Sequence, residues 1–570
     1  MALTCSSRYL VLVLTLVMIA APAAAASPDP VRGTGGAVAS AAPAATQAGL
    51  EILRAGGNAV DAAVAVAIAL AVVHPQAGNL GGGGFAVLRM GGVVSALDFR
   101  EAAPAAADHD MYLDENGEPV SQKSLVGPLA TGVPGSPAGL WELHRRHGKL
   151  DWAQVVIPAA RLAGDGFVVT PRLEGSVLKA KRLLGRFPET AAVWLPGGEP
   201  PAAGSVMIIP ALAATLRAYA EHGPEAITGG SLAAAIETAS DLHGGVLTVT
   251  DLEAYRPVWR EPIVFDAFGW RVASMPLPSS GGIILGQTAG LLERAEWQRT
   301  PRFGAERAHL LAEAWRRAYA DRFLLGDPST TRATAADLLD EDWLDQRARE
   351  LRSRQATPSA EIRSWSPPGE RESTETTHLS VADGAGNVVS ITTTLNGSFG
   401  CGLLVPGVGF LLNNEMDDFA AAPGRPNFYG LIQGEANAVG PGKRMLSSMS
   451  PTVAWRETET VALGSPGGST IPTVTVQVLL NVVVDGDDIQ AAVNRPRIHH
   501  QWMPDQIVVE PDALAPETAR ELERRGHELK ERSRLGEVNV VRTTSDGIVE
   551  AAADPRGPGS AGVVNPAPGS

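Results

Sequence analysis

The fold is decided by residues 376–394, TTHLSVADGAGNVVSITTT. Apolar and polar residues alternate on both sides of the turn at residues 383–387, DGAGN, a pattern that predicts an antiparallel β-hairpin. Residues 352–375, directly before it, are rich in Pro, Ser and charge and predict a disordered linker. Thr376 is therefore the first residue of a strand, and a cut in the linker would make it a new N-terminus.

An N-terminal threonine carries a nucleophile and a base on one residue. The hydroxyl of Thr is a poor nucleophile that needs a base, and no His/Asp relay is evident in the sequence. A free α-amino group titrates near about pH 7.7–8.0, so it can act as that base at neutral pH. In the intact chain this nitrogen is an amide, so the chemistry requires a cut between Glu375 and Thr376. On residue pattern alone, an ordinary Thr that starts a strand remains the alternative.

Composition places the chain among globular proteins. Its 570 residues suffice for a large core or for more than one domain, and 45% are apolar. The net charge of −15 argues against nucleic acid as a partner, because nucleic acid favours basic surfaces.

Residues 1–26 are predicted to be a secretory signal peptide. Arg8 supplies positive charge, Tyr9–Ile19 form a short apolar run, and Ala23–Ala26 are small residues before a cleavage site near Ala26. An uncleaved membrane anchor is the alternative, but the run is shorter than the roughly 20 apolar residues that a span needs. We therefore expect an exported protein, periplasmic or secreted, with no membrane contact once the signal is removed.

Cysteine usage predicts a fold without disulfides. Cys5 would leave with the signal peptide, so only Cys401 remains in the mature chain. No basic residue adjoins Cys401 in the sequence FGCG to lower its pKa, so we interpret it as a passive, packed residue rather than a nucleophile.

Strands and helices are predicted on both sides of residue 376. Expected helices include Thr46–Arg54, Asn58–Val73, Trp152–Ala163, Ile209–His222, Leu232–Leu242, Ala305–Tyr319, Thr473–Val483 and Pro516–Arg525, and expected strands include Phe85–Met90, Val93–Phe99 and Val264–Ser274. This pattern favours a layered α/β sandwich in one interleaved domain. The Pro/Gly-rich end, Asp554–Ser570, is expected to be a mobile tail.

Common cofactor motifs are missing from the sequence. There is no His-Glu-x-x-His or Cys-x-x-Cys for zinc, no Gly-x-x-x-x-Gly-Lys-Ser/Thr, and no Gly-x-Ser-x-Gly elbow. The run Gly81–Gly84 precedes a strand rather than a helix, so it predicts a packing turn and not a phosphate loop. His499 and His500 are adjacent on a predicted strand, point to opposite faces, and are interpreted as structural.

Ordered motifs along most of the chain resemble one enzyme family. They are TTHLSV (376–381), NNEMDDF (413–419), SSMSPT (447–452) and GSPGG (464–468), with GGNAVDA (56–62), HPQ (74–76), NLGGGGF (79–85), LDFRE (97–101) and PSSGG (278–282) in the first half. Together they resemble the γ-glutamyltransferase (γ-glutamyltranspeptidase) family of N-terminal-nucleophile hydrolases, from about Gly36 to Pro555.

The resemblance implies a precursor that cuts itself before Thr376. Its products would be a large chain, residues 27–375, and a small chain, residues 376–570, which stay together as a heterodimer in a four-layer αββα sandwich. Thr376 would take the γ-glutamyl group from glutathione or a related amide and pass it to water or to an amino acid or dipeptide. No metal or organic cofactor is implied.

The resemblance also implies a clamp for the zwitterionic head group of the substrate. Arg100 with the hydroxyls of Ser447 and Ser448 would hold the α-carboxylate, a pairing that suits an arginine fork. The α-ammonium would be held by acceptors at three positions, Asn396, Glu415 and Asp418. Considered alone, Glu415 and Asp418 predict a solvated acidic turn.

Further roles follow from the same motifs. Backbone N–H groups of Gly467 and Gly468 would bind the oxyanion of the tetrahedral intermediate. Thr394 matches the family's second threonine, whose hydroxyl hydrogen-bonds the nucleophile. Residues 423–444 resemble a lid loop, with Tyr429 at the position of an aromatic gate.

Two other functions stay open at this point. One is a cephalosporin or glutaryl acylase on the same framework, whose substrates lack the α-ammonium and would not use Asn396, Glu415 and Asp418. The other is a non-catalytic secreted binding protein, in which loss of Thr376, Thr394 or Arg100 would be expected, although all three are present.

Overall fold

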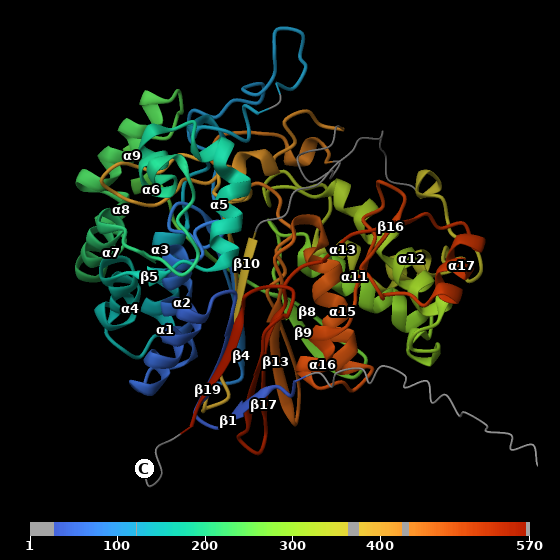
Figure 1. Ribbon diagram of the computed structural model, residues 1–570. Coiled ribbons are helices and arrows are strands. Elements are labelled where there is room, and N and C mark those ends of the chain that lie inside the picture. Colours follow the sequence, from blue (N-terminus) through green and yellow to red (C-terminus); the bar gives the residue numbers. More distant parts are fainter. Residues whose placement is uncertain (1–27, 121, 363–375, 425–432, 566–570) are drawn as a thin grey trace, which may run out of the picture.

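The structure is a computed structural model that describes residues 28–120, 122–362, 376–424 and 433–565. Two seven-stranded antiparallel sheets stack against each other. Figure 1 shows α1 to α9 on the left of this pair and α11 to α17 on the right. The chain therefore forms the predicted four-layer αββα sandwich.

The predicted hairpin lies in the middle of the first sheet. β10 (Thr376–Asp383) pairs with β11 (Val388–Thr394), and the register sets Thr376 opposite Thr394. The sheet order is β19-β2-β10-β11-β3-β4-β7. The other strands are β2 (Gly36–Ser40), β3 (Gly83–Met90), β4 (Val93–Phe99), β7 (Val258–Arg260) and β19 (Ser560–Val564).

The second sheet has the order β1-β18-β17-β13-β12-β9-β8. Its strands are β1 (Val31–Gly33), β8 (Ile263–Ala267), β9 (Trp270–Ser274), β12 (Thr452–Arg456), β13 (Glu459–Gly464), β17 (Asn539–Thr544) and β18 (Val549–Ala552). The single strand predicted at Val264–Ser274 is wrong: Phe268 and Gly269, both with positive φ, turn the chain into the hairpin β8–β9. Each sheet combines strands from before and after Thr376.

One helical layer covers the sheet that contains β10. Its central helix is α2 (Ala59–Val73), which is buried along its whole length because nearly all its side chains are apolar. Asn58 caps α2 through the backbone N–H groups of Val60 and Asp61. The other helices of this half are α1 (Pro43–Arg54), α3 (Ser136–His147), α4 (Trp152–Asp165), α5 (Pro171–Leu184), α6 (Pro188–Trp194), α7 (Pro210–His222), α8 (Glu225–Thr228), α9 (Gly230–Leu242) and α10 (Val249–Ala254), with the short pair β5 (Phe167–Val168) and β6 (Val206–Met207).

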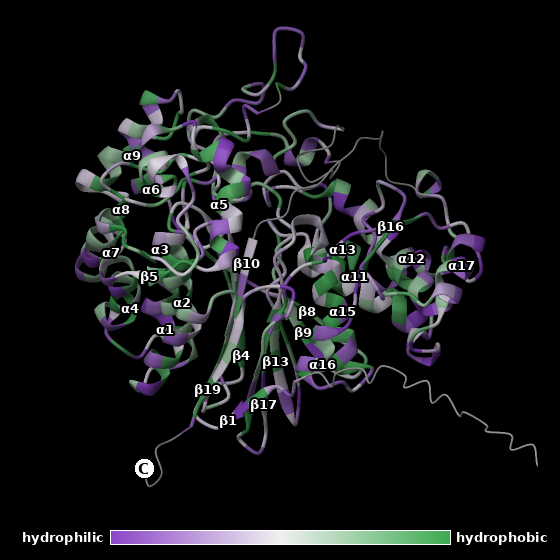
Figure 2. Cartoon of the chain, in the orientation of Figure 1, coloured by the Kyte–Doolittle hydropathy of each residue, from purple (hydrophilic) through white to green (hydrophobic). Residues whose placement is uncertain are grey.

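The other layer packs on the second sheet. It contains α11 (Gly281–Arg294), α12 (Ala305–Asp321), α13 (Ala335–Leu338), α14 (Glu341–Arg349), α15 (Ile471–Val483), α16 (Ile489–Asn494) and α17 (Pro516–Arg524), with the small sheet β14 (Ile498–His499), β15 (Ile507–Val509) and β16 (Leu529–Glu531). In Figure 2 the outermost helix, α17, is mostly hydrophilic, whereas the strands between the layers are mostly hydrophobic or neutral. The core thus lies between the sheets and beneath both helical layers.

Two sequence predictions about flexible segments are wrong in part. The predicted tail contains β19, which pairs with β2; its small residues let it pack under α1, where a Cβ on Gly562 would meet Leu50 at 2.6 Å. The first part of the predicted linker is ordered, since Ala356 donates its N–H to Arg525 O at 2.7 Å and Ser359 donates to Asp505 Oδ2 at 2.7 Å. Residues 363–375 and the predicted signal peptide lie outside the described residues.

Candidate active site

A pocket at the first residue of β10 gathers most of the predicted site residues. Its lining includes Arg100, Thr376, Thr394, Asn396, Glu415, Asp418, Ser447, Ser448 and Gly468. Gly467 directly precedes Gly468, and Tyr429 lies outside the described residues. The free volume is only about 20 Å³, close to the room that one water needs.

Thr376 and Thr394 lie side by side on paired strands. Both are buried, with Thr376 6% exposed. The Thr394 hydroxyl accepts a hydrogen bond from the backbone N–H of Asn396 at 2.7 Å, and Asn79 Nδ2 donates to Thr394 O at 2.7 Å. The second threonine is thus fixed next to the candidate nucleophile.

The glycine run Gly81–Gly84, predicted to be a packing turn, packs against β11, and its last two residues already belong to β3. A Cβ on Gly82 would lie 2.2 Å from Thr394 O, and one on Gly84 would lie 2.4 Å from Thr392 O. Because real Cβ atoms do not approach a carbonyl oxygen so closely, only glycine lets the two segments meet there.

The candidate oxyanion turn, Gly467–Gly468, lies just before α15 and is tied to α12 by a hydrogen bond. Gly467 and Gly468 have φ of 140° and 57°, in the region that favours glycine. Tyr319, from α12, donates its hydroxyl hydrogen to Ser469 O. The helix that follows places the positive end of its dipole near this turn, which suits an anion.

Arg100 is buried and paired with the two acids that were expected to bind an ammonium. Its Nη1 donates to Glu415 and its Nη2 to Asp418. Burial lowers the pKa of Arg100, but the nearby charges of Glu415 and Asp418 outweigh this and raise it above its ordinary value. The residues predicted to bind the two charges of the head group are therefore paired with one another in the structure.

The acidic segment is not the solvated turn that its composition suggests. Residues 415–418 form a short 3₁₀ turn, in which the Glu415 side chain is 1% exposed. Asn413 holds the turn, since its Oδ1 accepts the Glu415 N–H at 2.9 Å while its Nδ2 donates to Gly81 O at 2.8 Å. Burial raises the pKa of Glu415, and it raises that of neighbouring Glu101 to about 7.

The serine pair is held by the loop before α11. Ser447 donates its N–H to Pro278 O at 2.8 Å and accepts the Ser280 N–H on its carbonyl at 2.9 Å. The Ser447 hydroxyl accepts the Met449 N–H at 3.1 Å. The motif PSSGG (278–282) thus positions the serine pair of the motif SSMSPT (447–452).

The histidines nearest the site are structural. His378 bonds to Thr392 Oγ1 at 2.9 Å, and burial lowers its pKa to about 3, so it is neutral. His499 bonds to Thr473 and His500 to Asp505, as expected for structural residues. Among the described residues no cluster of three His, Cys, Asp or Glu side chains could hold a metal.

Cys401 is fully buried, and burial raises its pKa to about 11, which agrees with a passive role. Sequence reasoning missed four residues that line the pocket, Arg322, Met449, Ser469 and Ile471, of which Arg322 is the charged one. Arg322 lies directly after α12, and its only sequence signal is a cation at the end of a largely buried helix.

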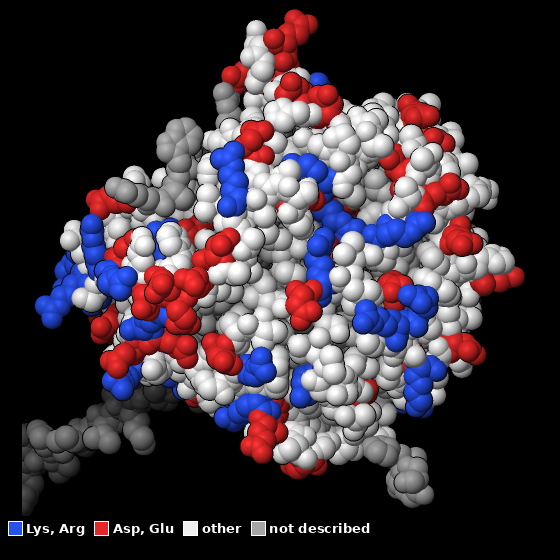
Figure 3. Space-filling model, turned by 180° about the vertical axis from the view of Figure 1, so that it is seen from behind, with Lys and Arg blue, Asp and Glu red and all other residues white. Residues whose placement is uncertain are grey.

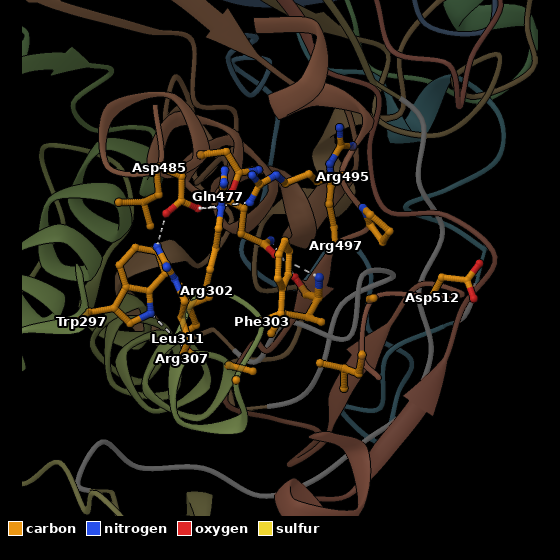
Figure 4. A pocket seen from close by; sticks show the side chains of 18 residues that line it. Trp297, Arg302, Phe303, Arg307, Leu311, Gln477, Asp485, Arg495, Arg497 and Asp512 are labelled. Carbon is orange, nitrogen blue, oxygen red and sulfur yellow. Dashed lines mark hydrogen bonds and ion pairs between the residues drawn. The ribbon is translucent and has the colours of Figure 1, made fainter. Parts of the chain in front are cut away.

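A larger cavity of about 140 Å³ lies in the outer helical layer and contains none of the predicted site residues. Figure 4 shows Trp297, Arg302, Arg307 and Asp485 around it. Its arginines are already paired, with Arg307 2.7 Å and Arg302 3.2 Å from Asp485. Its size alone therefore does not make it the reactive site.

The surface and the helices carry two further observations. On the face in Figure 3, acidic side chains are interspersed among basic ones, without the wholly basic surface that nucleic acid favours. Within the described ranges, no helix has both the length and the apolar character that crossing a membrane would require.

Comparison with known proteins identifies the family. Residues 45–564 match the family model described as gamma-glutamyltranspeptidase. The chain is 43% identical to the glutathione hydrolase proenzyme of Escherichia coli (strain K12) over 534 residues, which cover 92% of this chain and 91% of that protein. It is 41% identical to the proenzyme of the same name from Pseudomonas aeruginosa over 546 residues, which cover 93% of this chain and 95% of the relative.

A solved structure, cephalosporin acylase from Bacillus halodurans, is similar with a TM-score of 0.82 and 28% identity, covering 95% of this chain and 98% of that one. The family model and both relatives match more than nine-tenths of the chain, and the match to the family model includes every residue that lines the pocket. On this evidence, the chain belongs to the γ-glutamyltranspeptidase family.

Proposed function

We propose that this chain is a self-processing γ-glutamyltransferase with glutathione hydrolase activity. One observation carries the proposal: Thr376 shares a buried pocket with a cation, two acids and two serine hydroxyls, the groups that a glutamyl head group requires. The two relatives named glutathione hydrolase proenzymes support it.

The first reaction is the cut between Glu375 and Thr376. The Thr376 hydroxyl attacks the carbonyl carbon of Glu375, the C–N bond breaks, and the acyl group moves to the oxygen as an ester. The break of the C–N bond frees the Thr376 amine; water then hydrolyses the ester, which restores the Thr376 hydroxyl, gives Glu375 a carboxylate and leaves chains 27–375 and 376–570. The two chains stay together because both sheets contain strands of each.

The second reaction transfers the γ-glutamyl group. The free amine of Thr376 takes the proton of its own hydroxyl as the oxygen attacks the γ-amide carbon. Backbone N–H groups of Gly467 and Gly468 stabilise the oxyanion, and the proton passes to the leaving amine. Water or an acceptor amine, from an amino acid or dipeptide, then attacks the ester and regenerates Thr376.

Head-group binding is an exchange of ion pairs. The α-carboxylate replaces Glu415 and Asp418 on Arg100 and also meets Ser447 and Ser448. The released acids, with Asn396, accept the α-ammonium. Since the ion pairs inside the pocket offset the cost of burying these charges, the substrate replaces existing partners rather than entering an uncharged cavity.

Glu415 and Asp418 also distinguish the proposed function from the acylase alternative, because they favour a substrate that has an ammonium group. A glutaryl amide differs from a γ-glutamyl amide only in lacking the ammonium, so it would leave Glu415 and Asp418 buried without a partner. Hydrogen bonds to charged groups contribute about 1.5–3 kcal/mol, which corresponds to roughly 10- to 150-fold in rate.

We also propose export after removal of residues 1–26, and a lid at residues 423–444 with Tyr429 as its gate.

The test compares kcat/KM for γ-glutamyl anilide and glutaryl anilide on the processed protein. We expect at least about a tenfold preference for the γ-glutamyl compound, as the lost ammonium contacts require. Equal or faster hydrolysis of the glutaryl compound would favour the acylase. Inactivity toward both compounds would contradict both enzymes and favour the binding protein.

A further inference from the structure

Arg322 is a second buried cation in the active-site pocket. It is 3% exposed and lines the pocket together with Arg100 and Thr376. Its Nε donates to Ser280 Oγ at 3.0 Å. Its Nη1 is buried and has no hydrogen-bond partner, and within the part of the chain that the structure describes Arg322 has no ion-pair partner.

A buried guanidinium without a counter-charge is unfavourable, since burial removes its hydration and nothing replaces it. Burial lowers the pKa of Arg322 to about 10, while the nearby charge of Asp418 acts in the opposite direction. The group is therefore still charged at neutral pH. Arg100 in the same pocket is paired with Glu101, Glu415 and Asp418, whereas Arg322 has only the Ser280 hydroxyl among the described residues, so Arg322 is the cation of this pocket that is available to an anionic group of a ligand.

The position of Arg322 indicates which ligand group it meets. Ser280 connects it to the serine pair, because the Ser280 hydroxyl accepts from Arg322 and donates to Ser447 O at 2.8 Å. Ser447 and Ser448 are the hydroxyls assigned to the α-carboxylate. Arg322 thus approaches the pocket from the side where that carboxylate binds.

We propose that Arg322 is a further substrate-binding residue, whose Nη1 donates to the α-carboxylate of the γ-glutamyl group. This inference rests on the proposed function. Arg322 also adds a second guanidinium to a site in which Arg100 already faces three acidic side chains, Glu101, Glu415 and Asp418.

The test uses Arg322→Gln in the processed enzyme and two competitive inhibitors. L-Glutamate carries the α-carboxylate, and 4-aminobutyrate is the same molecule without it. We expect the KM for γ-glutamyl anilide and the Ki of L-glutamate to rise at least about tenfold, since a charged hydrogen bond is lost. The Ki of 4-aminobutyrate should stay within about twofold. Equal increases for both inhibitors, or no increase, would overturn the proposal.

Two further variants test whether Arg322 binds the α-carboxylate directly or only positions Ser280. Arg322→Lys keeps the charge and should raise the Ki of L-glutamate selectively but less, and it serves as the test if the Gln variant does not fold. Ser280→Ala removes the hydroxyl between Arg322 and Ser447. If it matched Arg322→Gln, Arg322 would act only through Ser280, against the proposal. Arg302→Gln, in the separate cavity, is the control and should change neither Ki. Activity of the wild type on γ-glutamyl anilide, measured first, shows separately whether the proposed function holds.

Discussion

The chain contains two buried charged clusters of similar composition, and they differ in how well their carboxylates are satisfied. In the first, on α12, Glu313 accepts hydrogen bonds on both oxygens, from Arg316, Arg317 and Thr357. In the second, around Arg100 of the active-site pocket, Glu415 Oε2 and both oxygens of Glu101 have no hydrogen-bond partner among the described residues.

The pKa shifts follow this difference. Burial raises the pKa of Glu313, but Arg316 and Arg317 outweigh it, so the net shift is downward. Burial raises the pKa of Glu415, and the charge of Arg100 does not offset it. Unsatisfied buried polar groups are costly. The difference agrees with a structural role for the first cluster and with the proposed substrate-binding role of the second.

The largest effect is expected in the active-site pocket, which holds the second cluster, when the nucleophile is removed. Thr376→Ala removes the hydroxyl that both reactions need. The variant should remain one chain on a denaturing gel and lose at least about 10⁴-fold in kcat/KM. A Thr376→Ala protein that is cut, or that hydrolyses γ-glutamyl anilide at the wild-type rate, would contradict the assignment.

Removing a charge from the first cluster, on α12, should instead lower the free energy of unfolding. Glu313→Gln leaves Arg316 and Arg317 buried with a neutral partner, and we expect about 3–5 kcal/mol of lost unfolding free energy. Urea unfolding measures this. Because Glu313 does not line the pocket, kcat/KM per folded molecule should not change; a selective loss of activity would remove the contrast between the clusters.

Removing a charge from the second cluster, in the active-site pocket, should weaken substrate binding more than it lowers stability. Arg100→Ala removes the cation assigned to the α-carboxylate, while self-cleavage continues. The KM for γ-glutamyl anilide should rise about 10- to 150-fold, the equivalent of one charged hydrogen bond. A normal KM in this variant would exclude Arg100 from the carboxylate site.

Acid should weaken the fold through its buried histidines. Burial lowers the pKa of His74 and His378 to about 3, whereas an unfolded histidine titrates near about 6.5. The unfolded chain binds more protons between these values, so their contribution is complete above about pH 6.5 and declines as pH falls. Each should cost about 2 kcal/mol between pH 7 and pH 5. His378→Gln should reduce this pH slope of the unfolding free energy; an unchanged slope would show that His378 is not neutral in the fold.

The sequence was sufficient for the hairpin, the helices and the order of the motifs, because these depend on local periodicity and on turn residues such as those at 383–387. It was insufficient where distant segments decide the outcome. β19 exists because β2 offers it an edge, and residues 352–362 are ordered because α12 and Asp505 bind them. Glu415 and Arg322 could not be placed by composition, since their burial depends on Arg100 and Ser280, far away in the sequence.

The central claim is that a free amine at residue 376 activates the hydroxyl of the same residue. N-terminal sequencing of the active protein, combined with intact mass, tests it most directly. The account predicts two chains, one of which begins Thr-Thr-His-Leu and runs to residue 570. A single uncut chain with full γ-glutamyl activity, or a second chain that begins at another residue, would contradict it.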